Sequence, residues 1–285
     1  MASTLRLSTA GMLMVVLLLA LAACNSGSTG ETENHTDTFT VKAGAVLVVD
    51  NQNGSVDVVV GGEGAITVKT TVYNPDKVEY VAELDGDTVR IKANITGVFG
   101  NLGGARTGAD IKITVPPDTE LFLESSNGRV EVSGISAKTK IGTSNGRVRV
   151  SSVTGRMDVR TSNGAIEVRG GGGEYHLRTS NGTIDMDDFQ GSVDAVTSNG
   201  GIEFSGNLDH GTASRLESSN GHIEVEFIKT PSVEIDASTS NAEIHLERAI
   251  TTMSVGSGHI EGIIGDGDGE AKLKIRSSNG SVTIR

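Results

Sequence analysis

The chain has 285 residues and carries 24 Lys and Arg against 36 Asp and Glu, a net charge of −12. This acidic balance disfavours nucleic acid and anionic membrane surfaces as partners. Aromatic residues make up 3% of the chain, Trp is absent, and a single Cys excludes an internal disulfide. The 38 Gly residues, placed among short runs of Val and Ile, favour narrow β coils over a thick sandwich core.

Residues 1–23 have the pattern of a signal peptide. Arg6 precedes the apolar run 12–20, which is too short to span a bilayer as a helix. The run leads into Leu21-Ala22-Ala23-Cys24, which resembles the lipobox of bacterial lipoproteins. The resemblance implies cleavage before Cys24 and a lipid on it, and several acyl chains anchor a protein stably. We therefore expect a membrane-anchored lipoprotein of the bacterial cell envelope that faces outside the cytoplasm, with an ordinary secretory peptide as the alternative.

Residues 24–38 are predicted to form a flexible tether. After Cys24 they are all polar or Gly, so nothing offsets the entropy that is lost on ordering. A flexible chain of this length reaches roughly 20 Å. Removal of residues 1–23, which contain one basic residue and no acidic residue, changes the net charge from −12 to −13.

Residues 39–120 are predicted to form an irregular β region that starts the stack and caps it. Val46–Val58 looks like an early copy of the later repeat, and Asp85-Gly86-Asp87 predicts a tight turn between two strands. Pro116-Pro117 cannot occupy a central position of a β ladder and marks the beginning of the regular coils. A cap is expected because an open end of a β stack is an adhesive edge.

Residues 121–285 are organised by the repeat Thr/Ser-Ser-Asn-Gly. Its asparagines recur at intervals of 18 residues from Asn127 to Asn199 and then at 21. After each copy, hydrophobic and other residues alternate with the period of two that is typical of a half-buried strand. A fixed period with a turn in every copy predicts an all-β, single-chain β-solenoid (a β-helix) with coils of ~18–21 residues.

The repeated Asn-Gly pair is predicted to form the same corner in every coil. Gly accepts a positive φ without a Cβ clash, and Asn tolerates this geometry better than most residues. Asn amides at one corner can hydrogen-bond from coil to coil in a structural ladder, and binding of sugar hydroxyls by the same groups is the alternative. The predicted ladder consists of Asn127, Asn145, Asn163, Asn181, Asn199, Asn220, Asn241 and Asn279.

Carboxylates form an outward column beside the inward Val and Ile positions. Glu167, Asp185, Glu203 and Glu224 have no basic residue between them in this column, so they should repel one another. They are candidates for a cation site or a basic-ligand face, and the alternative is a solvated face that prevents sideways β association. Asp266 and Asp268 lie in a Gly-rich acidic segment without the EF-hand pattern. Calcium is the one cation that these residues suggest, and we expect no other cofactor.

The run Asp110-Ile-Lys-Ile-Thr-Val-Pro-Pro-Asp-Thr-Glu-Leu-Phe-Leu-Glu-Ser-Ser-Asn-Gly-Arg-Val-Glu-Val132, followed by the Thr-Ser-Asn-Gly units, resembles the DUF4097 family. That family is described as adhesin-like. The resemblance covers residues 39–285 and implies a right-handed β-solenoid. It brings no activity and no agreed catalytic or binding residues.

The sequence predicts a non-enzymatic, lipid-anchored cell-envelope protein, adhesin-like or scaffolding. Its expected partners are the membrane, through the lipid on Cys24, and other envelope proteins or surface glycans. One alternative is a polysaccharide-acting enzyme on a parallel β-helix, but such enzymes need an aromatic-lined groove and converging acid and base groups. Three Tyr and no Trp make such a groove a poor fit. The other alternative is a cation-dependent binding module that uses the acidic column.

Overall fold

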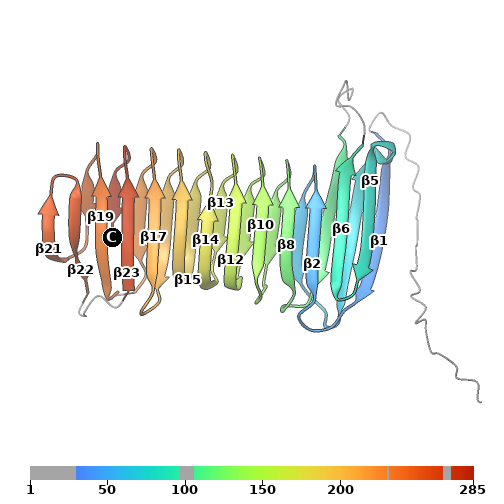
Figure 1. Ribbon diagram of the computed structural model, residues 1–285, viewed down its shortest axis with the longest axis horizontal. Helices are drawn as coiled ribbons and strands as arrows, with labels where there is room; N and C mark the ends of the chain where they lie inside the picture. The colour runs from blue at the N-terminus through green and yellow to red at the C-terminus, as the bar shows by residue number, and fades with distance from the viewer. Residues whose placement is uncertain (1–29, 97–105, 230, 266–270) are drawn as a thin grey trace, which may run out of the picture.

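The computed structural model describes residues 30–96, 106–229, 231–265 and 271–285. Within them the chain forms a long β-solenoid whose strands stack side by side along one axis (Figure 1). Two rows of strands face each other across the core, and each coil contributes one strand to the first row and one to the second. The all-β solenoid predicted from the repeat is confirmed.

The regular coils lie in the middle of the stack, and their strands pair in parallel. In the second row Val148 pairs with Val130 on one side and with Ile166 on the other, so neighbouring strands lie one repeat apart. The first-row strands here are β8 (Glu120–Ser125), β10 (Thr139–Thr143), β12 (Thr154–Thr161), β14 (Gly172–Arg178) and β17 (Ala213–Ser218). The second-row strands are β9 (Val130–Ser133), β11 (Val148–Ser151), β13 (Ile166–Arg169), β16 (Ile202–Leu208) and β18 (Ile223–Phe227). The long strand β15 (Ile184–Thr197) contributes to both rows.

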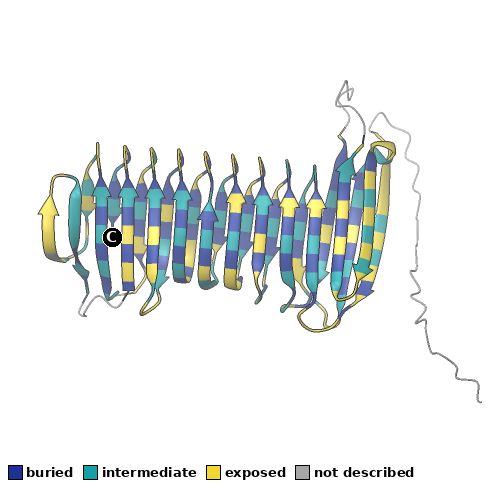
Figure 2. Ribbon diagram, viewed as in Figure 1, coloured by how far each residue is buried: buried dark blue, intermediate teal, exposed yellow. Residues whose placement is uncertain are grey.

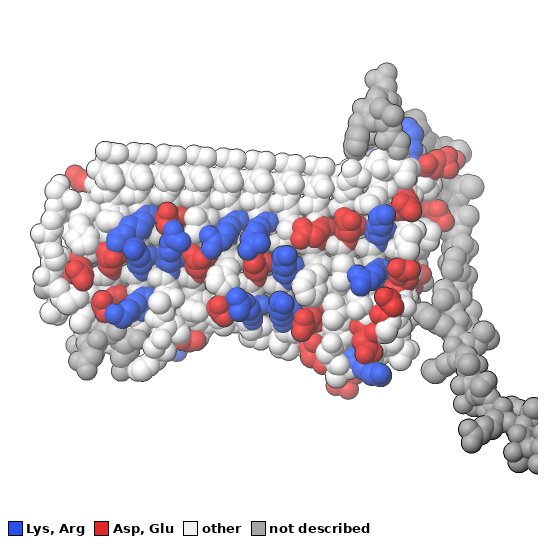
Figure 3. All heavy atoms as spheres, viewed as in Figure 1, with Lys and Arg blue, Asp and Glu red and all other residues white. Residues whose placement is uncertain are grey.

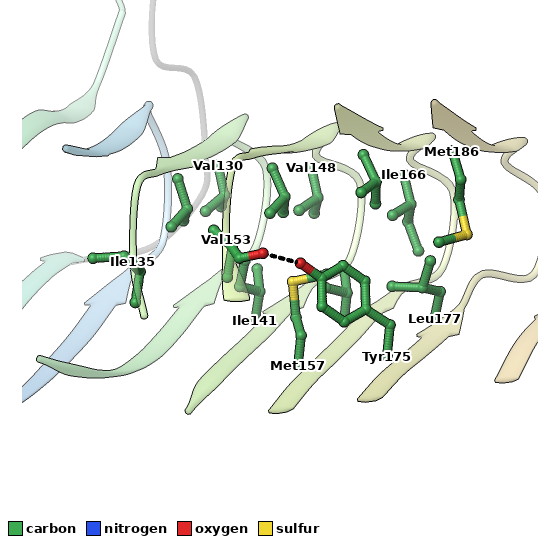
Figure 4. Close-up of a cluster of buried hydrophobic side chains, with 14 of the residues drawn as sticks. Val130, Ile135, Ile141, Val148, Val153, Met157, Ile166, Tyr175, Leu177 and Met186 are labelled. Carbon is green, nitrogen blue, oxygen red and sulfur yellow. Dashed lines mark hydrogen bonds between the residues drawn. The ribbon is translucent and has the colours of Figure 1, made fainter. Parts of the chain in front are cut away.

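The core is a narrow column of side chains between the two rows. Along each strand, buried and accessible residues alternate (Figure 2). The inward positions predicted from this alternation, such as Val130, Val148 and Ile166, are fully buried. Figure 4 shows these side chains meeting those of the opposite row, among them Ile141 and Leu177.

Aromatic rings fill part of the core in a row of their own. Tyr175, Phe189, Phe204 and Phe227 are buried, and successive ring centroids are 4.8, 6.1 and 6.4 Å apart. The Tyr175 hydroxyl donates a hydrogen bond to the Val153 carbonyl oxygen at 2.5 Å (Figure 4). Because this hydroxyl has a partner, the ring can be buried without leaving a polar group unsatisfied.

The stack does not follow chain order on its C-terminal side. β17 and β18 pair with β23 (Ala271–Ser277) and β24 (Val282–Ile284), and β19 (Val233–Thr239) and β20 (Ile244–Leu246) lie beyond these. β22 (His259–Ile264) and β21 (Thr251–Gly256) then add antiparallel strands to β19. The coils within residues 121–285 therefore do not all stack in the order of the sequence.

The corner sequences are compatible with this exchange of order. Ser277-Ser278-Asn279-Gly280 repeats Ser218-Ser219-Asn220-Gly221, whereas the coil between them in the sequence has Ala242 in place of the glycine. The coil with Ala242 still makes the corner hydrogen bonds, from Thr239 to the Gly280 carbonyl oxygen and from Asn241 to Asn279. The repeat marks each coil but does not specify its neighbour.

The N-terminal side of the stack is built from antiparallel strands. β2 (Val46–Asn51) and β3 (Val56–Val60) form a coil that pairs in parallel with β8 and β9. The remaining elements are β4 (Ala65–Tyr73), the 3-10 turn η1 (Pro75–Lys77), β5 (Val78–Asp85), β6 (Thr88–Ile95) and β7 (Gly108–Val115). β7 extends the second row and pairs antiparallel with β4, while the hairpin β5–β6 extends the first row next to β2.

The predicted flexible tether is wrong over residues 32–38, because these residues belong to the strand β1 (Thr32–Thr40). The strand pairs antiparallel with β4 along its whole length. The ring of His35 stacks on Tyr80 with centroids 4.7 Å apart, and the Tyr80 hydroxyl donates to Asp37 at 2.9 Å. The prediction considered only apolar side chains, whereas backbone hydrogen bonds and these polar contacts order the segment.

Candidate functional site

The repeated corner brings the backbones of neighbouring coils into direct contact. A Cβ added to Gly164 would lie 1.7 Å from the carbonyl oxygen of Gly146, and one added to Gly182 would lie 1.8 Å from that of Gly164. The residues with positive φ include neither these glycines nor the ladder asparagines, so the left-handed geometry predicted for the corner is wrong. Gly is required there because the coils approach too closely for any side chain.

Buried hydroxyls connect the coils just inside this corner. The Thr179 hydroxyl accepts a hydrogen bond from the Gly182 N–H at 3.1 Å and donates one to the Gly164 carbonyl oxygen at 3.1 Å. Thr161 and Thr197 make the same two bonds one coil away on either side. The first residue of each repeat is therefore a structural link between coils.

The eight predicted asparagines form one unbroken ladder along the corner. Every side-chain amide except that of Asn127, the first in the stack, donates to the carbonyl oxygen of its neighbour on the N-terminal side, at 2.7–2.8 Å. Asn279 lies between Asn220 and Asn241, as the strand order requires. All the amides point the same way, which lets successive hydrogen bonds polarise one another.

A row of serines runs beside the ladder. Ser144, Ser162, Ser180 and Ser198 are exposed, and within the described residues their hydroxyls make no hydrogen bond. Together with the ladder asparagines they form what we call the polar ridge, an uncharged strip of regularly spaced hydrogen-bonding groups. The ridge can contact a partner along many coils at once.

The acidic column is present on successive second-row strands, and most of its charges are compensated. Strand pairing places Glu167, Asp185, Glu203 and Glu224 next to one another in that order. Three of the four carboxylates are paired with an arginine, which offsets much of the expected repulsion, whereas Glu203 has the imidazole of His222 nearby. The pairs are Glu167–Arg149 at 2.8 Å, Asp185–Arg169 at 2.6 Å, Glu203–His222 at 3.6 Å and Glu224–Arg285 at 2.7 Å.

The column borders a shallow hollow on the second row. Asp187 and Glu226 add two further carboxylates to its lining. We call the outward side chains of β13, β15, β16 and β18 the acidic face. Within the described ranges, no group of three or more His, Cys, Asp or Glu is placed to hold a metal ion. The other two metal candidates, Asp266 and Asp268, lie outside the described residues.

From β10 to β19 the outward side chains of the first row carry an excess of basic residues (Figure 3), whereas on β8 they include Glu120 and Glu124. On β10, β12, β14, β15, β17, β23 and β19 the acids are Asp158, Glu174, Asp194, Glu217, Glu234 and Asp236. The more numerous bases are Lys140, Arg156, Arg160, Arg178, Arg215, Lys272, Lys274 and Arg276. We call this surface the basic face.

Sequence reasoning missed the basic face because part of it depends on the strand order. β23 lies between β17 and β19 and brings Lys272, Lys274 and Arg276 next to Arg215. Arg276 forms a two-pronged ion pair with Asp236 at 2.5 and 2.8 Å, whereas Lys274 and Lys140 form no ion pair among the described residues. The hydrogen bonds from Arg276 hold the pKa of the Asp236 carboxyl below its usual value.

The predicted lipid site, Cys24, lies outside the described residues. In the part of the chain that the structure describes, no helix is long and apolar enough to cross a membrane. Lipid anchoring therefore remains a prediction from the sequence.

The parallel coils and the repeated Ser-Asn-Gly corners place the protein among the repetitive β-solenoids. A family model described as Toastrack DUF4097 matches residues 45–285, and the chain belongs to this family. No curated protein matches the chain.

Several solved structures resemble the chain at low sequence identity. A putative adhesin from Bacteroides fragilis is 12% identical, covers 91% of this chain and 100% of its own, and has a TM-score of 0.45. A putative adhesin from Parabacteroides distasonis is 11% identical, with coverage of 89% and 97% and a TM-score of 0.40. A protein from the same organism described as a putative lipid binding protein is 12% identical, with coverage of 88% and 97% and a TM-score of 0.32. These similarities are too distant to indicate a function.

Proposed function

We propose that the protein is a non-enzymatic, lipid-anchored component of the bacterial cell envelope that acts as an adhesin-like or scaffolding rod. The observation that carries this proposal is the unbroken corner ladder, which fixes the coils relative to one another and keeps the faces beside it continuous. A rigid surface of this kind suits a repetitive partner such as a surface glycan or an array of envelope proteins.

The two charged faces give the rod two different contact surfaces. On the basic face Lys140 and Lys274 form no ion pair among the described residues, although Lys274 lies opposite Asp236 and interacts with its charge. Both lysines can contribute to binding carboxylate or sulfate groups of a partner. On the acidic face Glu167, Asp185 and Glu224 are paired with arginines, which favours a solvated surface over a cation site.

Anchoring is tested with the full chain expressed in a bacterial host. The parent protein should be recovered with the membrane fraction, and its N-terminal peptide should carry acyl chains by mass spectrometry. Cys24→Ser should move the protein to the soluble fraction or leave residues 1–23 uncleaved. An unmodified Cys24 in a fully exported parent would refute the lipid anchor.

Binding is tested with immobilised neutral, carboxylated and sulfated polysaccharides and with isolated envelope fractions. A Lys140→Glu/Lys274→Glu double variant should bind anionic polysaccharides at least several-fold more weakly than the parent. Lys69→Glu/Lys112→Glu is the matched control, because both lysines are exposed, form no ion pair among the described residues and lie on β4 and β7, outside the basic face. Hydrolysis of any of these polysaccharides by the parent protein would overturn the non-enzymatic assignment.

A further inference from the structure

The open strand edges at the two ends of the solenoid differ in how many charged residues they carry. At the N-terminal end the edge strands are β1, which includes Glu33 and Asp37, and β5, which includes Glu79, Glu83 and Asp85. Charged side chains on an edge strand discourage pairing with another chain. This end is therefore protected.

The other end, which we call the distal tip, has one protected edge and one open edge (Figure 1). β20 is three residues long, pairs only with β24 and is flanked by Glu243 and Glu247, so its edge is short and charged. β21 is six residues long, pairs only with β22, and has no charged residue from Thr251 to Gly258. Its single protecting feature is an irregularity in pairing at Met253.

The side chains of β21 are also unusually apolar for their exposure. Val255 is 69% exposed and Met253 56% exposed, the two highest values among the large hydrophobic residues that the structure describes. Behind them, the inward residues Ile244, Leu246 and Ile250 of the last coil are only partly buried. An uncharged edge with exposed apolar side chains at the end of an incompletely covered core is a surface that a further strand would stabilise.

We propose that this strand comes from a second copy of the chain, with the two β21 strands paired antiparallel about a two-fold axis. Two mature chains of net charge about −13 repel each other over most of their surfaces. The uncharged β21 is where they can approach without placing carboxylates opposite each other. Antiparallel pairing of identical strands is self-complementary, and a two-fold interface closes on itself, so each tip would be used once.

The pairing would join two rods tip to tip. If the lipid anchor of the proposed function is present, the two anchors lie at opposite ends of the dimer, and the dimer can connect two membrane surfaces. The pairing itself does not depend on the anchor, so a soluble form can test it separately.

The test uses residues 24–285 with Cys24→Ser, a form that contains every described strand and no cysteine. Val255→Cys in this background should give a covalent dimer with a short bismaleimide cross-linker at micromolar protein concentration. Val81→Cys is the matched control, because Val81 is an exposed valine on the protected edge strand β5 at the other end. The expected dimer yield is at least five-fold higher for the Val255 variant. Equal yields would overturn the proposal.

A second measurement does not depend on cross-linking. Sedimentation velocity at increasing concentration should show dimers of the parent form, and Val255→Lys should remain monomeric with an unchanged circular dichroism spectrum. Val81→Lys should dimerise like the parent. A parent form that is monomeric at 100 µM, or a Val255→Lys variant that dimerises equally, would refute pairing through β21.

Discussion

The tightest packing constraint in the molecule is at the corner glycines, and Gly164→Ala tests it. The new Cβ would lie 1.7 Å from the Gly146 carbonyl oxygen, and real Cβ atoms essentially never approach within 3.0 Å of such an atom. Because the obstacle is the backbone of Gly146, which cannot move aside as a side chain can, the two coils must separate. The hydrogen bonds at this junction then lengthen or break.

The expected cost follows from those hydrogen bonds. The junction includes the Thr161 hydroxyl to the Gly146 carbonyl, the Asn163 amide to Asn145, and the Asn163 N–H to the Ser144 carbonyl. At roughly 0.5–1.5 kcal/mol net for each bond, with lost packing added, Gly164→Ala should lower the free energy of unfolding by about 2–5 kcal/mol. This is a large share of the ~5–15 kcal/mol that stabilises a typical domain.

The assay is urea unfolding of residues 24–285 with Cys24→Ser, followed by circular dichroism. Gly256→Ala is the control, since a Cβ there meets no atom within 4 Å and its φ is not positive. The control should change the free energy of unfolding by less than about 1 kcal/mol. If Gly164→Ala costs no more than Gly256→Ala, close backbone approach is not the reason for Gly at the corner.

Three further predictions concern the ladder and the two charged faces. Asn181→Ala removes two ladder hydrogen bonds and should destabilise the protein by about 1–2 kcal/mol in the same assay; no change would mean that the exposed ladder adds no stability. Millimolar calcium should not raise Tm relative to a chelator control, because three of the four column carboxylates are paired with arginines and no three possible ligands converge among the described residues; a rise that Glu203→Gln abolishes would contradict this. Asp236 has a lowered pKa in the folded protein, so its stabilising effect is present above the ordinary value of 3.8 and is lost as pH falls below it. The stability difference between the parent and Asp236→Asn should therefore shrink on acidification from pH 7 to pH 3, and a difference independent of pH would refute the pairing with Arg276.

The sequence predicts the structure of a single coil well because three independent features of the repeat agree. The 18-residue period, the alternation around Val148 and Ile166, and the Ser-Asn-Gly corner all require the same strand–corner–strand unit. The order of the coils is different, because any corner of this type can stack on any other. Only the pairing of β23 with β17 and β19 reveals that order.

The same distinction, between what the repeat determines and what the strand order determines, applies to the candidate surfaces. The acidic column was predicted because its members lie in consecutive repeats. The pairing of Glu224 with Arg285 was not predicted, since β24 lies beside β18 only after the change of strand order. The basic face was missed for the same reason. The segment 32–38 was missed because its order depends on Tyr80 and on the edge of β4, which are distant in sequence.

The position of β23 and β24 also limits the order in which the protein can fold as its chain is synthesised. A sequential solenoid can add each coil to its predecessor as soon as that coil emerges. Here β19 and β20 emerge before the two strands that separate them from β17 and β18. The strands β19 to β22 must therefore wait, unpaired or wrongly paired, until residues 271–285 have emerged, and this makes them the segment that most needs protection by chaperones.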